Sequence, residues 1–297
     1  MGTPDFAVPS LEILIENKFT VVAVITAPDK PSGRGLKIQT SPVKDTAVIH
    51  NIPVLQPTNL KDPTFIEELK GYNANLQIVV AFRMLPEIIW NMPAIGTFNL
   101  HGSLLPQYRG AAPINWAIIN GEKETGCTTF FLQQEIDTGD ILFSEKEPIG
   151  KVDTFEDLYN RLKLKGAKLV LKTVKAIEKK EYTSVPQVFS ESLKNAPKIH
   201  KATCEIDWTK SAIEVNNFIR GLSPYPAAWT ILNGKILKIF SVTILSEEST
   251  KPAGTVESDQ KTYLYYHTGK GVLSIQSLQL EGKKRMNIDE FLRGNKI

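Results

Sequence analysis

The first 150 residues alternate between short apolar runs and stretches with helical periodicity. Apolar runs that predict buried strands occupy residues 20–26, 76–81 and 96–100. Apolar positions at helical spacing lie near residues 5–17, 42–50, 62–70 and 113–120. Because strands that alternate with helices build sheets covered on both faces, the pattern predicts an α/β domain with a doubly wound, mostly parallel, Rossmann-like sheet.

A long helix is predicted from Thr154 to about Glu178. Thr154 and Asp157 have the spacing of a helix-capping pair, and apolar residues follow at helical spacing. Lysines recur along this helix at steps of three and four, at Lys165, Lys168, Lys172, Lys175 and Lys179. They form one basic stripe, for which a solvated helix face is the simpler interpretation and phosphate contact the alternative.

The last third of the chain follows a different pattern. Residues 183–203 contain two prolines and little apolar periodicity, as expected of a linker. A helix is predicted at 211–220, followed by short strands at 228–232, 236–245, 262–266 and 272–278. This pattern predicts a small OB-like β-barrel. We therefore expect a catalytic domain at 1–182, a linker at 183–203 and a second domain at 204–297.

Composition narrows the class of protein. The 297 residues are 42% hydrophobic and 23% charged, which is typical of a globular protein, and no apolar run is long enough to span a bilayer. The two cysteines lie far apart, which favours a reduced, cytoplasmic compartment over a disulfide framework. The four histidines lack metal-ligand spacing, so we expect no metal site. Because no apolar run could span a bilayer, we also expect no membrane partner.

Candidate chemistry lies at the end of the predicted strand 96–100. Asn99 and His101 are two residues apart, so their side chains point the same way, at the edge where doubly wound sheets bind ligands. Both can donate hydrogen bonds to one developing oxyanion. Asp137, on a later turn, can fix the tautomer of His101 and favour its charged form. Each residue alone is more typical of a turn or a structural contact, but together they predict acyl transfer without a covalent intermediate.

The same strand end carries a resemblance to a known family. The block from Phe98 to Trp116 reads FNLHGSLLPQYRGAAPINW, and Asp137-Thr138-Gly139-Asp140 follows it. Further matching segments are 1–9, 31–35, 41–44, 206–208 and 223–226. From end to end the chain resembles the methionyl-tRNA formyltransferase family, within the folate-dependent formyltransferase superfamily.

The resemblance implies transfer of a formyl group from 10-formyltetrahydrofolate to the α-amino group of methionyl initiator tRNA, by a monomer that uses no metal. It implies that Asn99 and His101 stabilise the oxyanion and that Asp137 holds His101 charged and takes up the amine proton. It also implies a folate pocket shaped by residues 103–106 and by the main chain near residues 82–84. These folate candidates are Ser103, Leu104, Leu105, Pro106, Phe82, Arg83 and Met84.

Residues 28–44 are rich in proline, glycine and basic side chains, among them Lys44. Such a loop packs no core and is typical of a mobile binding element. In the family it enters the acceptor arm of the tRNA, and the resemblance makes Arg34 the critical contact. Residues 198–297 hold 14 Lys and Arg against 10 Asp and Glu, which permits a polyanion partner. The tRNA candidates are Arg34, Gly33, Gly35, Lys37, Lys284 and Arg285.

Two points remain open in the sequence. Family members carry an apolar strand before Gly2-Thr3-Pro4, and here Met1 stands where that strand would end, so we expect the native protein to begin upstream. An amino-sugar formyltransferase is the main alternative, and the loop at 28–44 argues against it. A nicotinamide-dependent dehydrogenase lacks its glycine motif here, and an RNA-binding module would leave Asn99, His101 and Asp137 without a role.

Overall fold

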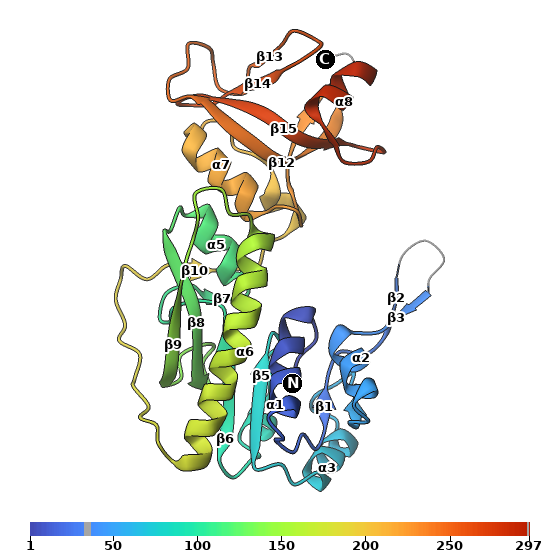
Figure 1. Cartoon of the computed structure of the whole chain (residues 1–297), viewed down its shortest axis with the longest axis vertical. Coiled ribbons are helices and arrows are strands. Elements are labelled where there is room, and N and C mark those ends of the chain that lie inside the picture. The colour runs from blue at the N-terminus through green and yellow to red at the C-terminus, as the bar shows by residue number, and fades with distance from the viewer. Residues whose placement is uncertain (33–36, 296) are drawn as a thin grey trace. The chain divides into compact units, whose positions relative to one another are not determined.

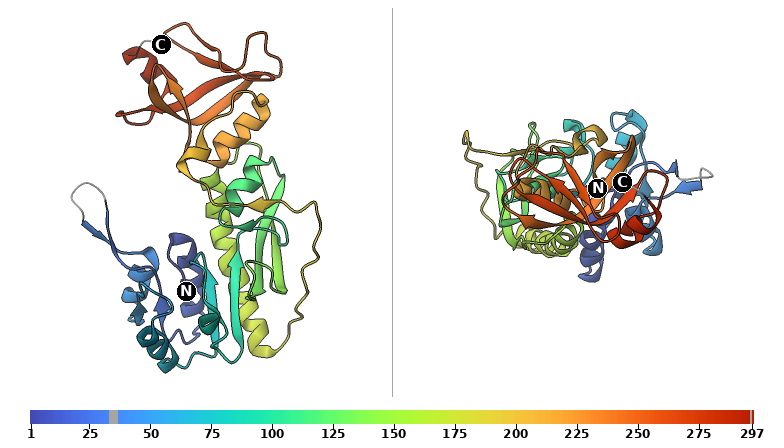
Figure 2. Two further views of the ribbon diagram at one scale, coloured as in Figure 1. Left: turned by 180° about the vertical axis from the view of Figure 1, so that it is seen from behind. Right: turned by 90° about the horizontal axis from the view of Figure 1, so that it is seen from above.

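A computed structural model describes residues 1–32, 37–295 and 297 of the chain (Figures 1 and 2). These residues form two compact units. The first unit comprises residues 1–109, 126–147 and 159–195, and the second comprises 110–125, 148–158 and 196–297. Each unit is built from segments that are not consecutive in the chain. The domain boundaries that we expect near residues 182 and 204 therefore stay a prediction.

A mainly parallel sheet forms the centre of the first unit. β1 (Val24–Ile25) pairs in parallel with β4 (Val54–Leu55), and β5 (Leu76–Val80) pairs in parallel with β6 (Gly96–His101). β8 (Glu124–Phe131) lies antiparallel to β6, and β9 (Ile141–Pro148) is the next strand of that sheet. The α/β class and the mostly parallel sheet predicted from the sequence are thus confirmed.

Between β1 and β5 the main chain of Met1 and Gly2 takes the place of a strand. The amide of Gly2 donates to the carbonyl of Ile25 on one side (3.1 Å), and the amide of Val80 donates to the carbonyl of Met1 on the other (2.9 Å). These bonds join the two parallel pairs. The strand predicted at 20–26 is shorter than expected, because only Val24 and Ile25 have a strand partner among the described residues.

Helices and a hairpin surround this sheet. The helices are η1 (Asp5–Ala7), α1 (Val8–Glu16), α2 (Pro42–Ile49), α3 (Pro63–Gly71), α4 (Glu87–Trp90) and α6 (Phe155–Lys179), and the hairpin is β2 (Lys30–Ser32) with β3 (Lys37–Gln39). β7 (Arg109–Gly110) and β10 (Asn195–Ala196) form a separate two-stranded pair. The capping pair predicted for the long helix is present, since the amide of Thr154 donates to the Asp157 carboxylate (2.9 Å) and the amide of Asp157 donates to Oγ1 of Thr154 (3.3 Å).

The long helix α6 covers one face of the sheet (Figure 1). A Cβ added at Gly166 would lie 2.7 Å from the Leu100 side chain, and the buried thiol of Cys127 contacts the carbonyl of Leu162. Leu100 therefore points toward α6. Because side chains alternate along a strand, Asn99 and His101 point to the opposite face.

The second unit contains a curled antiparallel sheet. Its strands are β11 (Ala228–Leu232), β12 (Lys235–Ser246), β15 (Val272–Leu280), β14 (Leu264–His267) and β13 (Val256–Ser258), in that order, with β16 (Met286–Asn287) paired to β15. Its helices are α5 (Pro113–Ile119), η2 (Lys201–Cys204), α7 (Ala212–Gly221) and α8 (Ile288–Gly294). Irregularities in the β12–β15 pairing bend the sheet around a core that includes Leu237, Ile275 and Ile219. This agrees with the OB-like domain predicted from the sequence.

Candidate active site

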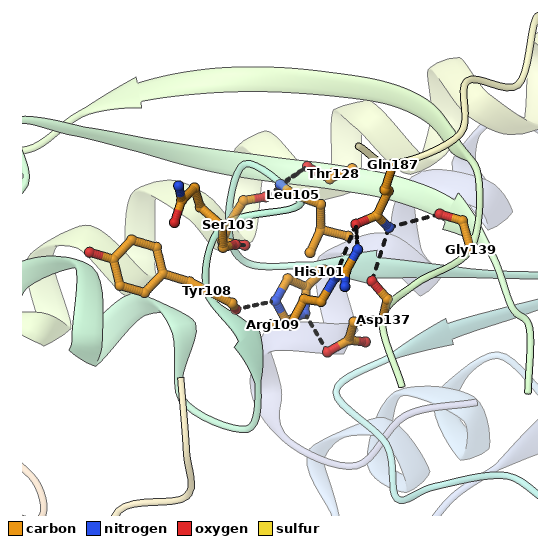
Figure 3. Close-up of polar contacts among 10 residues, drawn as sticks. His101, Ser103, Leu105, Tyr108, Arg109, Thr128, Asp137, Gly139 and Gln187 are labelled. Carbon is orange, nitrogen blue, oxygen red and sulfur yellow. Dashed lines mark hydrogen bonds and ion pairs between the residues drawn. The ribbon is translucent and has the colours of Figure 1, made fainter. Parts of the chain in front are cut away.

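The imidazole of His101 is buried at the carboxyl end of β6, with 6% of the residue exposed. Its Nε2 lies 2.8 Å from the carbonyl oxygen of Tyr108 (Figure 3). A carbonyl only accepts, so Nε2 carries a proton and donates it. The tautomer is therefore fixed by a main-chain group that the sequence analysis did not identify. The other ring nitrogen, Nδ1, lies 3.8 Å from Oδ2 of Asp137.

Asp137 lies on a tightly constrained turn between β8 and β9. Its φ of 55° falls in the left-handed region, which Asp tolerates better than most residues. Two residues on, a Cβ at Gly139 would come within 1.7 Å of the carbonyl oxygen of Phe131, so this position requires glycine. Close approach of the main chain at Gly139 thus places the Asp137 carboxylate beside His101.

Asn99 shares the strand face of His101 and is half-buried. Within the described part of the chain no hydrogen-bond partner occupies its side-chain amide. Half-buried amides are usually hydrogen-bonded, so an unbonded one at a strand end is available to a bound molecule. The structure thus places Asp137 beside His101 and Asn99 on the same strand face as His101, while their roles in catalysis stay a prediction.

The turn at 103–106 follows His101 directly and is stabilised from within. Ser103 is fully buried and its hydroxyl donates to the carbonyl of Gln107 (2.6 Å). Thr128 Oγ1 donates to the Ser103 carbonyl (2.7 Å) and accepts from the amide of Leu105 (3.1 Å). The four residues predicted to shape a folate pocket therefore form a rigid turn, in which the Ser103 hydroxyl has a structural role.

Residues 82–84 follow β5, the parallel neighbour of β6. The guanidinium of Arg83 donates to the carbonyls of Pro57 and Thr58, so this side chain is held by the loop beside it. Met84 is 71% exposed. Over the residues that the structure describes, the main chain of Phe82, Arg83 and Met84 forms no hydrogen bond with other main-chain groups. These amides and carbonyls lie at the same sheet edge as Asn99.

The hairpin β2–β3 lies within the predicted tRNA loop. Gly33, Arg34 and Gly35 lie outside the described residues, and Lys37 is the first residue of β3. The base of the loop is closed by Lys44, whose Nζ contacts Asp29 (2.5 Å) and the Gln56 side-chain oxygen (2.8 Å). Gln56 Nε2 also donates to Asp29 (2.7 Å). Lys44 thus belongs to this clasp of Asp29, Lys44 and Gln56, although the sequence analysis counted it among the basic residues of the loop.

In the second unit, the tRNA candidates Lys284 and Arg285 lie in the turn between β15 and β16. Lys284 is exposed. Arg285 stacks over the ring of Phe240 at 4.4 Å, and its Nε donates to Ser277 Oγ (2.9 Å). Arg285 is therefore anchored on the sheet surface while Lys284 extends into solvent.

The lysine stripe on α6 is largely engaged within its own unit. Lys165 pairs with Glu147 (2.9 Å), Lys172 pairs with Glu145 (3.0 Å) and Lys175 donates to the Asn17 side chain (3.1 Å). These contacts favour the simpler interpretation, a structural and solvated helix face.

Comparison with known proteins identifies the family. A family model described as formyl transferase matches residues 1–174, and one described as formyl transferase, C-terminal domain, matches residues 198–296. The chain belongs to the formyl transferase family. A methionyl-tRNA formyltransferase from Bacteroides thetaiotaomicron is 54% identical over 306 residues, which cover 100% of this chain and 95% of that protein. The enzyme of that name from Flavobacterium johnsoniae is 51% identical over 298 residues, covering 99% of this chain and 94% of the relative. This formyl transferase is therefore an enzyme.

Solved structures of two other proteins share the fold. The sugar 3N-formyl transferase WlaRD, determined with dTDP and 5-N-formyl-THF, superposes with a TM-score of 0.67 at 23% identity, over 95% of this chain and 97% of that one. HypX from Aquifex aeolicus, in complex with tetrahydrofolic acid, gives a TM-score of 0.59 at 20% identity, over 81% of this chain and 42% of that one. At this identity the likeness confirms the fold of both parts of the formyl transferase.

The structure of this formyl transferase also bears on its cysteines, on membrane-spanning helices and on metal ligands. Cys127 and Cys204 are both free and buried, and burial raises the pKa of the Cys127 thiol to about 12. Across the described residues, no helix is both long enough and apolar enough to cross a membrane. In residues 1–32, 37–295 and 297, no three His, Cys, Asp or Glu side chains gather as a metal ion would require.

Sequence reasoning missed two side chains at the site. Gln187 donates to the carbonyls of Asp137 and Gly139, and Arg109 donates to Gln187. Gln187 comes from a segment without periodicity, 50 residues beyond Asp137 along the chain. The pattern of residues gives no signal for such a contact. Arg109 lies inside the block that carries the family resemblance, but neither its charge nor its spacing points to Gln187.

Proposed function

We propose that this chain transfers the formyl group of 10-formyltetrahydrofolate to the α-amino group of methionyl initiator tRNA. Full-length relatives that are more than half identical bear the name of this activity. The observation in the structure that carries the proposal is the side-chain amide of Asn99, which has no hydrogen-bond partner among residues 1–32, 37–295 and 297 and lies on the strand face it shares with His101. That arrangement suits a reaction in which charge develops on a carbonyl-type oxygen.

In the proposed reaction the amine attacks the formyl carbon, a carbon–nitrogen bond forms, and the bond from that carbon to the folate nitrogen breaks. The amine loses a proton, and the departing nitrogen gains one. Asn99 donates to the formyl oxygen while negative charge builds there. His101 Nε2 is bound to the Tyr108 carbonyl, so Nδ1 is the ring atom left to face the reaction. Asp137, 3.8 Å from Nδ1, stabilises a proton on that atom and receives the proton of the amine directly or through water.

The donor would be held by two neighbouring strand ends. The main-chain groups of residues 82–84, which form no main-chain hydrogen bond with any residue that the structure describes, suit the amide-like edge of a pterin. Their use would not depend on the side chains of Phe82, Arg83 and Met84. Residues 103–106 form the rigid turn beside it. The Leu104, Leu105 and Pro106 side chains would then contribute apolar contacts, since the Ser103 hydroxyl is already bonded.

The RNA would be held by both parts of the chain. The loop at 28–44 supplies Arg34, whose planar guanidinium can stack on an unpaired base or bind a phosphate through two bonds. Gly33 and Gly35 flank it, and Lys37 adds charge. Lys284 extends from the second unit toward solvent, where a phosphate can reach it. Residues 1–182 would then act as the catalytic part and 204–297 as the tRNA-binding part of a monomer.

The decisive experiment is single-turnover formylation of methionyl initiator tRNA by the wild type, His101→Ala and Arg34→Ala. Wild type is expected to transfer the formyl group. His101→Ala should lower the rate constant by roughly 100-fold or more at saturating tRNA. Arg34→Ala should weaken tRNA binding and leave hydrolysis of the donor unchanged. A folded wild type that passes the formyl group to amino sugars and ignores the tRNA would overturn the assignment of the acceptor.

A further inference from the structure

The chain segment after α6 runs alongside the loop that carries Asp137. Val185 and Ile141 exchange two main-chain hydrogen bonds in an antiparallel bridge, at 2.8 and 2.9 Å. In an antiparallel pair, residue numbers rise along one segment while they fall along the other, so the residue two positions after Val185 lies opposite the residue two positions before Ile141. This bridge therefore sets Gln187 opposite Gly139. The position of Gln187 at the active site is thus dictated by main-chain pairing.

The Gln187 amide has every hydrogen-bonding position filled (Figure 3). Its Nε2 donates to the carbonyls of Asp137 (2.9 Å) and Gly139 (2.8 Å). Its Oε1 accepts from Nε and Nη2 of Arg109, at 3.1 and 2.6 Å. A side-chain amide offers two donors and two acceptor lone pairs, so none is left for a substrate. Gln187 is bound entirely to the protein.

These four bonds join the two sides of the His101 ring. Asp137 faces Nδ1, and the Tyr108 carbonyl receives Nε2–H. Arg109 follows Tyr108 in the chain, so Gln187 links the segment that fixes one ring nitrogen to the loop that faces the other. The ring of Phe189 stacks on the Arg109 guanidinium, with 5.1 Å between the charge centre and the ring centroid, and holds it in place from the same segment.

We propose that Gln187 and Arg109 are positioning residues, which set the distance between the Asp137 carboxylate and the His101 imidazole. This inference rests on the proposed function, because it assigns to Gln187 an effect on the reaction through Asp137. Neither residue needs to touch a substrate. A displacement of about 1 Å at a reacting group can cost about 100-fold in rate, so the effect should appear in kcat and not in KM.

Two substitutions separate the halves of the contact. Gln187→Met keeps the length of the side chain and removes all four bonds. Gln187→Glu retains acceptors for Arg109 and removes both donors to the Asp137 loop. We expect each variant to lower kcat roughly 10- to 100-fold with KM values for both substrates within about threefold of wild type. Gln187→Glu with wild-type kcat would overturn the proposed role of the two donors.

A double-variant cycle tests whether Gln187 acts through Asp137. In an Asp137→Asn background, Gln187→Met should change kcat by less than about twofold, since coupled residues are strongly non-additive. If the fold-loss of kcat in the double variant equals the product of the losses in the two single variants, the proposal is contradicted, because Gln187 would then act independently of Asp137. Gln134→Glu is the matched control. It makes the same chemical change as Gln187→Glu at an exposed residue of the loop that carries Asp137, and kcat should stay at the wild-type value.

Hydrogen exchange gives a readout that does not depend on activity. The amides of residues 134–140 should exchange at least about tenfold faster in Gln187→Met than in wild type, with exchange in α6 unchanged. Unchanged exchange rates at residues 134–140 would contradict the positioning role of Gln187. A wild type that fails to formylate the tRNA but shows the expected exchange would overturn the proposed acceptor and leave the Gln187 contact supported, so the two failures are distinguishable.

Discussion

His101 Nδ1 and Asp137 Oδ2 are 3.8 Å apart, which is longer than a hydrogen bond and within the range of an ion pair. The carboxylate therefore faces Nδ1 without a short hydrogen bond to it. The opposite side of the ring is held by the Tyr108 carbonyl. The ring is thus held at Nε2 by the main chain, and Nδ1 is the atom that faces the carboxylate.

Asn99 provides the first prediction. Asn99→Ala should lower kcat by roughly 100- to 1,000-fold, because the proposed oxyanion donor is removed. Stability should change little, since the amide has no partner to lose in the described part of the chain. Single-turnover formylation and thermal unfolding measure the two effects. Asn91→Ala, at an exposed helix end, is the control, and a rate for Asn99→Ala above one tenth of wild type would contradict the assigned role.

Gly139 provides a test of the turn that carries Asp137. Gly139→Ala would bring a Cβ within 1.7 Å of the Phe131 carbonyl, so the main chain must move. We expect a loss of about 2–4 kcal/mol in the free energy of unfolding, or, if the loop yields alone, a large loss of kcat in a stable protein. Gly71→Ala is the matched control, because a Cβ there meets nothing within 4 Å. Wild-type stability and activity for Gly139→Ala would contradict the close approach.

Glu147 predicts a dependence of stability on pH. Burial alone would raise the pKa of this carboxyl, but hydrogen bonds and charges from Lys165 and Arg161 outweigh burial and lower the pKa below its ordinary value. A lowered pKa in the folded state stabilises the fold above the unfolded-state pKa of about 4.3, and the stabilisation disappears as the pH falls through the lowered value.

Glu147→Gln should therefore reduce the free energy of unfolding by about 1–3 kcal/mol at pH 7, with a smaller difference from wild type near pH 3. Urea unfolding at both pH values measures this. Glu67→Gln, which breaks the exposed pair with Lys70, should cost less than about 0.5 kcal/mol. A Glu147→Gln effect that is independent of pH would show that packing, and not charge, is lost.

The clasp of Asp29, Lys44 and Gln56 predicts an effect confined to RNA binding. Gln56→Leu removes the side chain that contacts both Asp29 and Lys44, so the ends of the loop lose their fixed separation. We expect KM for the tRNA to rise roughly three- to tenfold, with KM for the folate donor unchanged. Combined with Arg34→Ala, the substitution should add nothing further. A change in KM for the folate donor would contradict this prediction, because it would show that Gln56→Leu also affects residues outside the loop.

The sequence predicted the parts that depend on local patterns. The helix from Thr154 was predicted correctly because capping and periodicity are local, and Asn99 and His101 share a face because strands alternate. The contacts of Tyr108 and Gln187 were not predictable. Tyr108 acts through its carbonyl, which every residue possesses, and Gln187 is placed by a bridge between segments about 45 residues apart. Lys44 was counted among the basic residues of the loop because composition does not show which charges are paired within the fold.

The bonds at the base of the loop at 28–44 also bear on how this enzyme can diversify. Gln56 and Lys44 hold Asp29 at one end of the loop against the start of α2 at the other. Once both ends are pinned, lengthening the intervening chain adds only a slowly growing entropic cost. Insertions and deletions between Asp29 and Lys44 are thereby uncoupled from the sheet, so this loop can change in length during evolution while the strand end that carries Asn99 and His101 stays in place.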